Sequence, residues 1–170
     1  DFPESIGRVK PFYGNIGVLI RAYAYLISVG SEGLRKIAES ALVNANYVST
    51  KLLDYVEIPY GKKCMHEFVA STKKFRTNGI TTLDIAKRLL DYGFHSRTIY
   101  FPLIVEDALM IEPTDTETKE TLDEFIEAVI KILEEAKTNP EILKIAPQNT
   151  PVSRLDEVQA ARKPDLRWQK

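Results

Sequence analysis

Two histidines are the side chains of this sequence best suited to moving protons near neutral pH. His66 precedes Glu67, as in a zinc-protease motif, but Ala70 stands where that motif needs its second histidine. On a strand, His66 and Glu67 would also point to opposite faces. His95 lies shortly before Thr98, at the expected entrance to another strand, where loops commonly carry functional groups. A structural role is as frequent as a functional one for His66, and more frequent for His95.

Other reactive side chains occur without the partners that chemistry would need. Cys64 is the single cysteine, so neither a Cys-x-x-Cys motif nor an internal disulfide is possible, and no metal site is expected. The lysine pairs at 62–63 and 73–74 are typical of solvated loops, and no glycine-rich phosphate loop is present. The residues alone therefore indicate two histidines of interest and no complete catalytic motif.

The composition is that of a soluble globular protein. The chain has 170 residues, of which 44% are hydrophobic and 28% charged, and its net charge is −1. This charge gives no reason to expect nucleic acid or an anionic membrane as a partner. The single cysteine and the lack of a signal peptide or membrane span favour a reducing, cytoplasmic setting. Because the first residue is Asp1, we expect a processed or excised piece of a protein.

Helical spacing dominates the first third of the chain. After an irregular arm at 1–14, residues 15–29 are apolar nearly all round, as in a helix buried on several sides. Gly30 provides a helix stop and Ser31 a new N-cap, and a long helix then continues to about Tyr55.

Shorter elements follow, in an order that predicts an α+β fold. From Val56 the hydrophobic period becomes two, which predicts a strand with alternating faces around 64–71. Thr81 or Thr82 caps a helix, and strands at 98–104 and 108–112 form an antiparallel hairpin. A Thr114 and Glu117 capping box opens a helix that ends at 139–140. A small antiparallel sheet with helices on one face satisfies this order.

Ordered segments over nearly the whole chain share a pattern with one family. They include GNIG at 14–17, ALVNANY at 41–47, MHEF at 65–68, AKRLLDYGFH at 86–95, LMIEPT at 109–114 and LRW at 166–168. The pattern resembles the C-terminal portion of subunit 2 of glycine dehydrogenase (decarboxylating), the P protein of the glycine cleavage system. Ordered matches of this extent are more specific than any single motif.

The resemblance implies a fold-type I pyridoxal-phosphate enzyme, in which a small C-terminal α+β domain closes a site on a large cofactor domain. Residues 1–30 would be an arm and connecting helix from the absent large domain, 31–146 the small domain and 147–170 a tail. The implied enzyme decarboxylates glycine with pyridoxal phosphate and passes the aminomethyl group to the lipoyl arm of the H protein. P protein subunit 1 would be its other partner.

The same resemblance bears on the site. The family's Schiff-base lysine lies in a histidine-lysine-threonine segment that this sequence lacks, so we expect no catalytic residue, no cofactor binding and no activity in the chain alone. His95, Thr98 and His66 are the candidates for the active-site edge. Arg97 stands where a proline-containing stretch is expected. A strong clamp on the glycine carboxylate would oppose its loss as neutral carbon dioxide, so we expect this arginine to be exposed.

Two other interpretations remain open. The chain could be a non-catalytic α+β interaction module, or the small domain of another fold-type I enzyme such as an aminotransferase.

Overall fold

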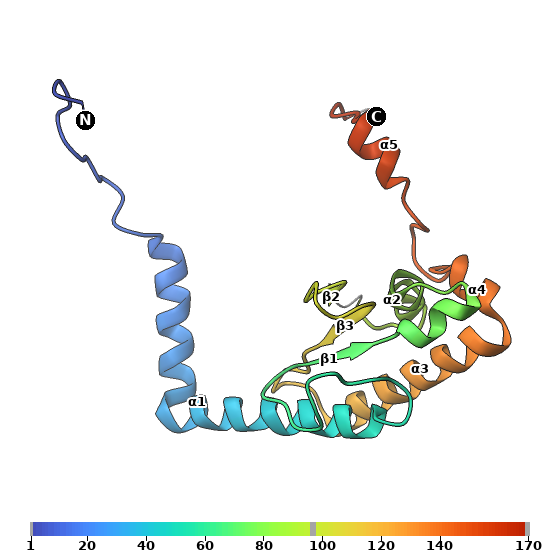
Figure 1. Cartoon of the computed structure of the whole chain (residues 1–170). Helices are drawn as coiled ribbons and strands as arrows, with labels where there is room; N and C mark the ends of the chain where they lie inside the picture. Colours follow the sequence, from blue (N-terminus) through green and yellow to red (C-terminus); the bar gives the residue numbers. More distant parts are fainter. Residues whose placement is uncertain (1, 96–97, 169–170) are drawn as a thin grey trace. The chain divides into compact units, whose positions relative to one another are not determined.

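The computed structural model describes residues 2–95 and 98–168, and the chain divides into two units, Asp1–Glu39 and Ser40–Lys170 (Figure 1). The predictions for Ser96 and Arg97 therefore lie outside the described residues. Helix α1 (Ile16–Leu52) continues from the first unit into the second. Gly30 interrupts it with non-helical angles (φ 66°, ψ 178°), which confirms the predicted helix stop. Only glycine adopts this backbone conformation readily.

The first part of α1 exposes most of its apolar side chains. Ile16, Ile20, Tyr23 and Ile27 are all at least 60% exposed, although the sequence predicts a helix buried on several sides. The difference has a simple cause, because the first unit otherwise contains only the arm before residue 16. Contiguous apolar surface of this kind is typical of an interaction site.

The second unit contains a three-stranded antiparallel sheet and several helices. After the end of α1 they are β1 (Phe68–Ser71), the 3-10 helix η1 (Lys73–Asn78), α2 (Thr82–Asp91), β2 (Thr98–Ile99), β3 (Ala108–Ile111), α3 (Lys119–Thr138), α4 (Pro140–Lys144) and α5 (Glu157–Arg162). The strand order is β1-β3-β2, with both pairs antiparallel. The predicted hairpin is confirmed in outline, although only two residues of its first strand pair with β3.

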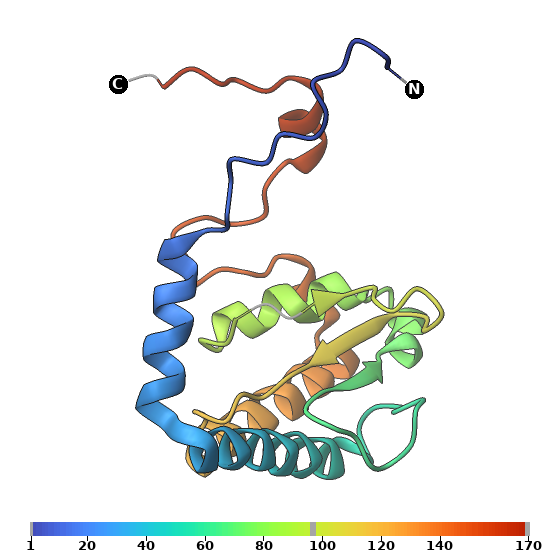
Figure 2. The same ribbon diagram turned by 90° about the vertical axis from the view of Figure 1, so that its left-hand side faces the viewer.

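Helices α2, α3 and α4 and the end of α1 cover one face of this sheet, as the sequence predicts (Figure 2). Apolar residues of α3, including Phe125, Val129 and Ile132, join a core with Leu109 and Ile111 of β3. That core also contains side chains of α1, β1, η1, α2 and α4. Alternate residues of a strand point to opposite faces, so β3 leaves Met110 on the other side of the sheet.

The strand predicted around 64–71 is correct only over its second half. Residues 68–71 form β1, whereas 58–67 form a loop after an isolated bridge between Glu57 and Ser71. The loop is held by Asn46 of α1, whose amide nitrogen donates to the Cys64 carbonyl at 2.7 Å and whose amide oxygen accepts from the Cys64 backbone N–H at 3.1 Å. These bonds satisfy the backbone that a neighbouring strand would otherwise pair.

The predicted start of α3 is wrong by one helical turn. Thr118, not Thr114, is the N-cap, and its hydroxyl accepts from the Thr121 N–H. The Thr114 carbonyl instead accepts a hydrogen bond from Asn44 of α1 at 2.9 Å, which holds this segment against another helix. The cap predicted for α2 at Thr81 or Thr82 is confirmed at Thr81, which also forms a capping box with Asp84.

Replacing the true cap should therefore affect stability more than replacing the predicted one. We expect Thr118→Ala to lower the free energy of unfolding by about 1 kcal/mol, because α3 loses a cap for an orphan N–H. Thr114→Ala removes only a hydroxyl contact with Thr116 and is expected to change it by less than about 0.5 kcal/mol. Urea denaturation of both variants measures the difference, and a larger loss for Thr114→Ala would contradict this assignment.

Candidate functional site

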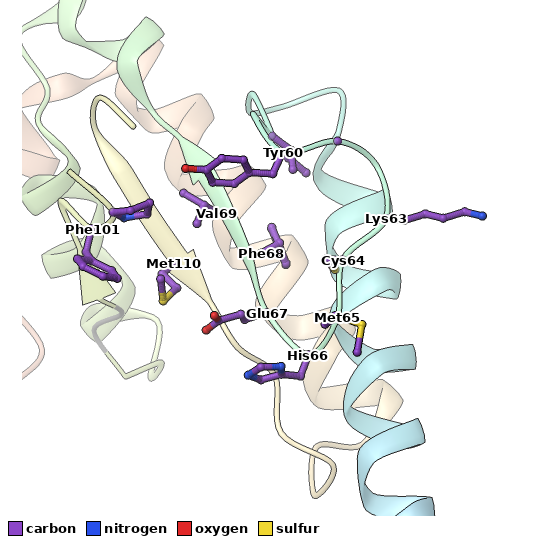
Figure 3. Close-up of a pocket in the computed structure, with 13 residues that line it drawn as sticks. Tyr60, Lys63, Cys64, Met65, His66, Glu67, Phe68, Val69, Phe101 and Met110 are labelled. Carbon is purple, nitrogen blue, oxygen red and sulfur yellow. The ribbon is translucent and has the colours of Figure 1, made fainter. Parts of the chain in front are cut away.

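A pocket of about 550 Å³ lies on the sheet face that the helices leave free (Figure 3). Its volume is within the range of small-molecule and cofactor sites. The loop before β1, the two longer strands and the loop after β2 contribute its walls. The lining residues are Ile58, Tyr60, Gly61, Lys63, Cys64, Met65, His66, Glu67, Phe68, Val69, Phe101, Pro102 and Met110.

Strand register places a row of three side chains on this face. Val69 of β1 and Thr98 of β2 are both directly opposite Met110 of β3. Residues directly opposite each other in antiparallel strands point to the same side of the sheet. Val69 and Met110 line the pocket, so Thr98 lies on the same face as the pocket floor.

His66 and Glu67 both line the pocket, which corrects the prediction that they point to opposite faces. They precede β1 and belong to the loop, where strict alternation does not apply. In Figure 3 the Glu67 carboxylate and the His66 ring lie on the side of Met110, whereas Lys63 points away from it. The edge of the pocket therefore carries a carboxylate and an imidazole.

The polar groups at this edge are only loosely restrained. His66 Nε2 lies 3.9 Å from Glu112 Oε1, and both side chains are 57% exposed, so an ion pair between them contributes little to stability. The imidazole is accordingly accessible to a substrate or to another part of the protein. Such access is what a proton-transferring or hydrogen-bonding group requires.

Cys64 is not suited to nucleophilic chemistry. Burial raises the pKa of its thiol, and a hydrogen bond with Ser49 only partly opposes this effect. A thiol with a raised pKa stays protonated near neutral pH and reacts slowly.

The opposite wall of the pocket is formed by the loop between β2 and β3, which ion pairs with η1 hold in place. Phe101 and Pro102 line the pocket, and the loop returns to β3 through Glu106 and Asp107. Arg76 of η1 contacts both carboxylates, with Nη1 2.8 Å from Glu106 Oε1 and Nε 2.9 Å from Asp107 Oδ2. Asp107 is buried and has a positive φ of 52°, a conformation that surrounding contacts must maintain. This wall is therefore held in place independently of any ligand.

The structure places two of the three predicted edge residues on the pocket side of the sheet. His66 lines the pocket and Thr98 shares its face of the sheet, whereas His95 is exposed and is not among the lining residues. Sequence reasoning did not identify Phe101 and Met110 as site residues. The alternation of β3 could have indicated Met110, but nothing in the sequence places the loop at 101–102 beside residue 66.

The lysines do not suit a Schiff base to pyridoxal phosphate. Across 2–95 and 98–168 every lysine is exposed except Lys87, which is half-buried on α2. Such a lysine needs an enclosed setting that deprotonates its amine, which a solvent-exposed position does not provide. Lys73, beside the pocket-wall loop, has its pKa raised further by its hydrogen bond to Glu106.

Two structural features are absent from the described residues 2–95 and 98–168. Within them, no helix is long and apolar enough to cross a membrane. The same part of the chain contains no group of three or more histidine, cysteine, aspartate or glutamate side chains that could hold a metal ion.

Comparison with known proteins identifies relatives along the full chain. Residues 37–153 match the family described as "Glycine dehydrogenase, C-terminal domain". The chain is 60% identical over all 170 residues to the probable glycine dehydrogenase (decarboxylating) subunit 2 of Caldanaerobacter subterraneus subsp. tengcongensis, and 58% identical to that of Halalkalibacterium halodurans. It spans 35% of the length of each of these relatives.

A solved structure shares the fold. The crystal structure of glycine decarboxylase (P-protein) of the glycine cleavage system, in inhibitor-bound form, matches with a TM-score of 0.56 and 23% sequence identity. The match covers 64% of this chain and 24% of that chain. At this identity the likeness concerns the fold of the domain.

Proposed function

Because the chain belongs to the glycine dehydrogenase family through its C-terminal domain, we propose that it is the small domain of subunit 2 of a glycine-decarboxylating enzyme. In this proposal the open face of its sheet forms part of the wall of the active site. Residues 1–30 lead from a large cofactor domain, 31–146 form the small domain and 147–170 a tail.

The observation that carries the proposal is the asymmetry of the sheet. One face is covered by the helices and holds the core, while the other holds a pocket with His66 at its edge and Thr98 on the same face. A domain that closes over a site needs one face for its own stability and one for the site. The braced loop at Phe101 and Pro102 gives that second face a fixed shape before anything binds.

The proposed reaction divides its parts between this chain and the rest of the enzyme. Glycine would lose its carboxylate as carbon dioxide, and the aminomethyl group would pass to the lipoyl arm of an H protein. Pyridoxal phosphate would be held elsewhere, since the lysines described here do not suit it. This chain would contribute an imidazole and a hydroxyl that orient groups at the edge of the site. Subunit 1 and the H protein are the proposed partners, in the cytoplasm.

The test replaces His66 in the complete two-subunit enzyme. We expect His66→Asn to reduce carbon dioxide release from glycine by about tenfold or more, since positioned groups of this kind contribute at least that much. The melting temperature should stay the same, because the side chain is 57% exposed. Lys62→Ala is the matched control, an exposed loop residue that does not line the pocket.

Two outcomes would contradict the proposal. Unchanged turnover in His66→Asn would remove this face from the active site. Transfer of the amino group from several amino acids to a 2-oxo acid, without carbon dioxide release, would identify the small domain of an aminotransferase instead.

A further inference from the structure

Helix α2 carries two buried carboxylates that face the same way. Asp84 and Asp91 are seven residues apart, two helical turns, so they lie on one face of the helix. Their side chains are 7% and 1% exposed. Buried carboxylates are normally paired or hydrogen-bonded, and the partners of these two come largely from a segment more than fifty residues away in the chain.

Asp91 holds the beginning of that segment. Its Oδ1 accepts the backbone N–H groups of Gln148 and Asn149 at 2.6 and 2.7 Å. Its carbonyl accepts a further bond from the Asn149 side chain at 3.3 Å. Arg88 contacts the other carboxylate oxygen at 3.0 Å, so the charge of Asp91 is also neutralised within α2.

Asp84 holds the end of the segment through Arg154. Arg154 Nη2 lies 2.6 Å from Asp84 Oδ1 and 2.8 Å from the Leu143 carbonyl, and its Nε donates to the Ala146 carbonyl at 2.7 Å. Leu143 lies in the last turn of α4 and Ala146 follows its C-cap, Ile145, where the C=O groups of a helix end take partners from outside the helix. One guanidinium thus joins the start of α2 to the end of α4, and Asp84 Oδ2 remains bound to the Thr81 N–H.

We propose that α2 is a two-point clamp for residues 148–154, named here the strap, and that Arg154 is the residue that keeps it closed. The strap then belongs to the folded domain, and the exposed tail begins at Leu155 rather than at residue 147. From Leu155 to Trp168 every residue is exposed, including α5 and the apolar side chains Val158 and Leu166. The clamp fixes the point from which this arm leaves the domain, and so reduces the conformational freedom that the arm would lose on binding.

Hydrogen exchange of the 170-residue chain tests the proposal directly, because the Gln148 and Asn149 amides are themselves clamp bonds. We expect both amides to be protected in the unmodified chain. Arg154→Ala should raise their exchange rates by about tenfold or more, although the substitution lies five residues from Asn149. Arg154→Lys should give an intermediate effect, since an ammonium cannot reproduce the fork that contacts Asp84 and both carbonyls.

The amides of α3 are the internal reference for folding. Arg162→Ala, in the exposed helix α5, is the matched control and should change neither set of amides. Fast exchange at 148 and 149 in the unmodified chain would overturn the clamp. Unchanged exchange there in Arg154→Ala, with α3 still protected, would overturn the proposal, because Asp91 would then hold the strap without Arg154. If the α3 amides also lose their protection in Arg154→Ala, the test passes to Asp91→Ala. Protection retained by the 148 and 149 amides in Asp91→Ala would overturn the proposal.

Discussion

Arg88→Ala is expected to lower the free energy of unfolding by about 3 kcal/mol, because it leaves a buried and a partly buried carboxylate without their cation. The Arg88 side chain is 12% exposed and binds Glu135 of α3 with two nitrogens, Nε and Nη2, each at 2.9 Å. A third nitrogen contacts Asp91 at 3.0 Å. The Tyr92 hydroxyl donates to Glu135 at 2.8 Å, so the network joins the end of α2 to α3.

An exposed ion pair is the control for this variant. Arg35 lies 2.7 Å from Glu39 on α1, and their side chains are 74% and 59% exposed. Arg35→Ala should change the free energy of unfolding by less than about 0.5 kcal/mol, as is usual for exposed pairs one helical turn apart. Urea denaturation at neutral pH measures both. Equal losses in the two variants would show that the Arg88 network has no special role.

Acidification should reduce the difference between Arg88→Ala and the unmodified chain. The Arg88 hydrogen bond lowers the pKa of Glu135 from its ordinary 4.5, against the effect of burial. Burial raises the pKa of Asp91, but the Asn149 and Gln148 N–H groups and Arg88 together lower it below 3.8. A lowered folded-state pKa gives stability that is present above the ordinary value and lost as the pH falls through the folded value. The loss in Arg88→Ala should therefore shrink below about pH 4.

The elements that the sequence predicts well are those whose own spacing determines their environment. The apolar positions of α3 recur at helical spacing, and most of them lie in the core. Thr81 and Asp84 lie three residues apart and form the capping box within one turn. Local rules suffice wherever the partners of a residue are its neighbours in the chain.

The predictions of secondary structure fail where a residue distant in the sequence hydrogen-bonds to a backbone group. Asn46 binds the Cys64 backbone across eighteen residues, and a strand-like pattern becomes a loop. Asn44 binds the Thr114 carbonyl from seventy residues away, and α3 begins one turn late. The site also depends on residues that are distant in the sequence. The chemistry of histidine can indicate His66 from the sequence alone, but only the folded sheet brings Phe101 and Met110 into the same pocket. Side-chain bonds to backbone groups leave no periodic signal in a sequence.

Leu109→Ala and Met110→Ala should separate stability from the proposed site, because these neighbours in β3 face opposite sides of the sheet. Leu109 is 2% exposed and lies in the main core, whereas Met110 lies across the sheet and lines the pocket. Removing a buried leucine costs its transfer free energy and leaves a cavity, so Leu109→Ala should lower the free energy of unfolding by about 3 kcal/mol. Met110→Ala, at a half-buried position, should cost about 1 kcal/mol.

The turnover of the complete enzyme with glycine, measured well below its melting temperature, should be lower in Met110→Ala than in Leu109→Ala. Leu109→Ala should keep its turnover there, since the residue does not reach the pocket, while Met110→Ala should lose it because the pocket floor between Val69 and Thr98 is removed. Chemical denaturation gives the stabilities, and carbon dioxide release gives the activities. Equal stability losses would mean that both faces of β3 are packed alike. Equal activity losses would mean that the face lined by Met110 has no special connection with the reaction.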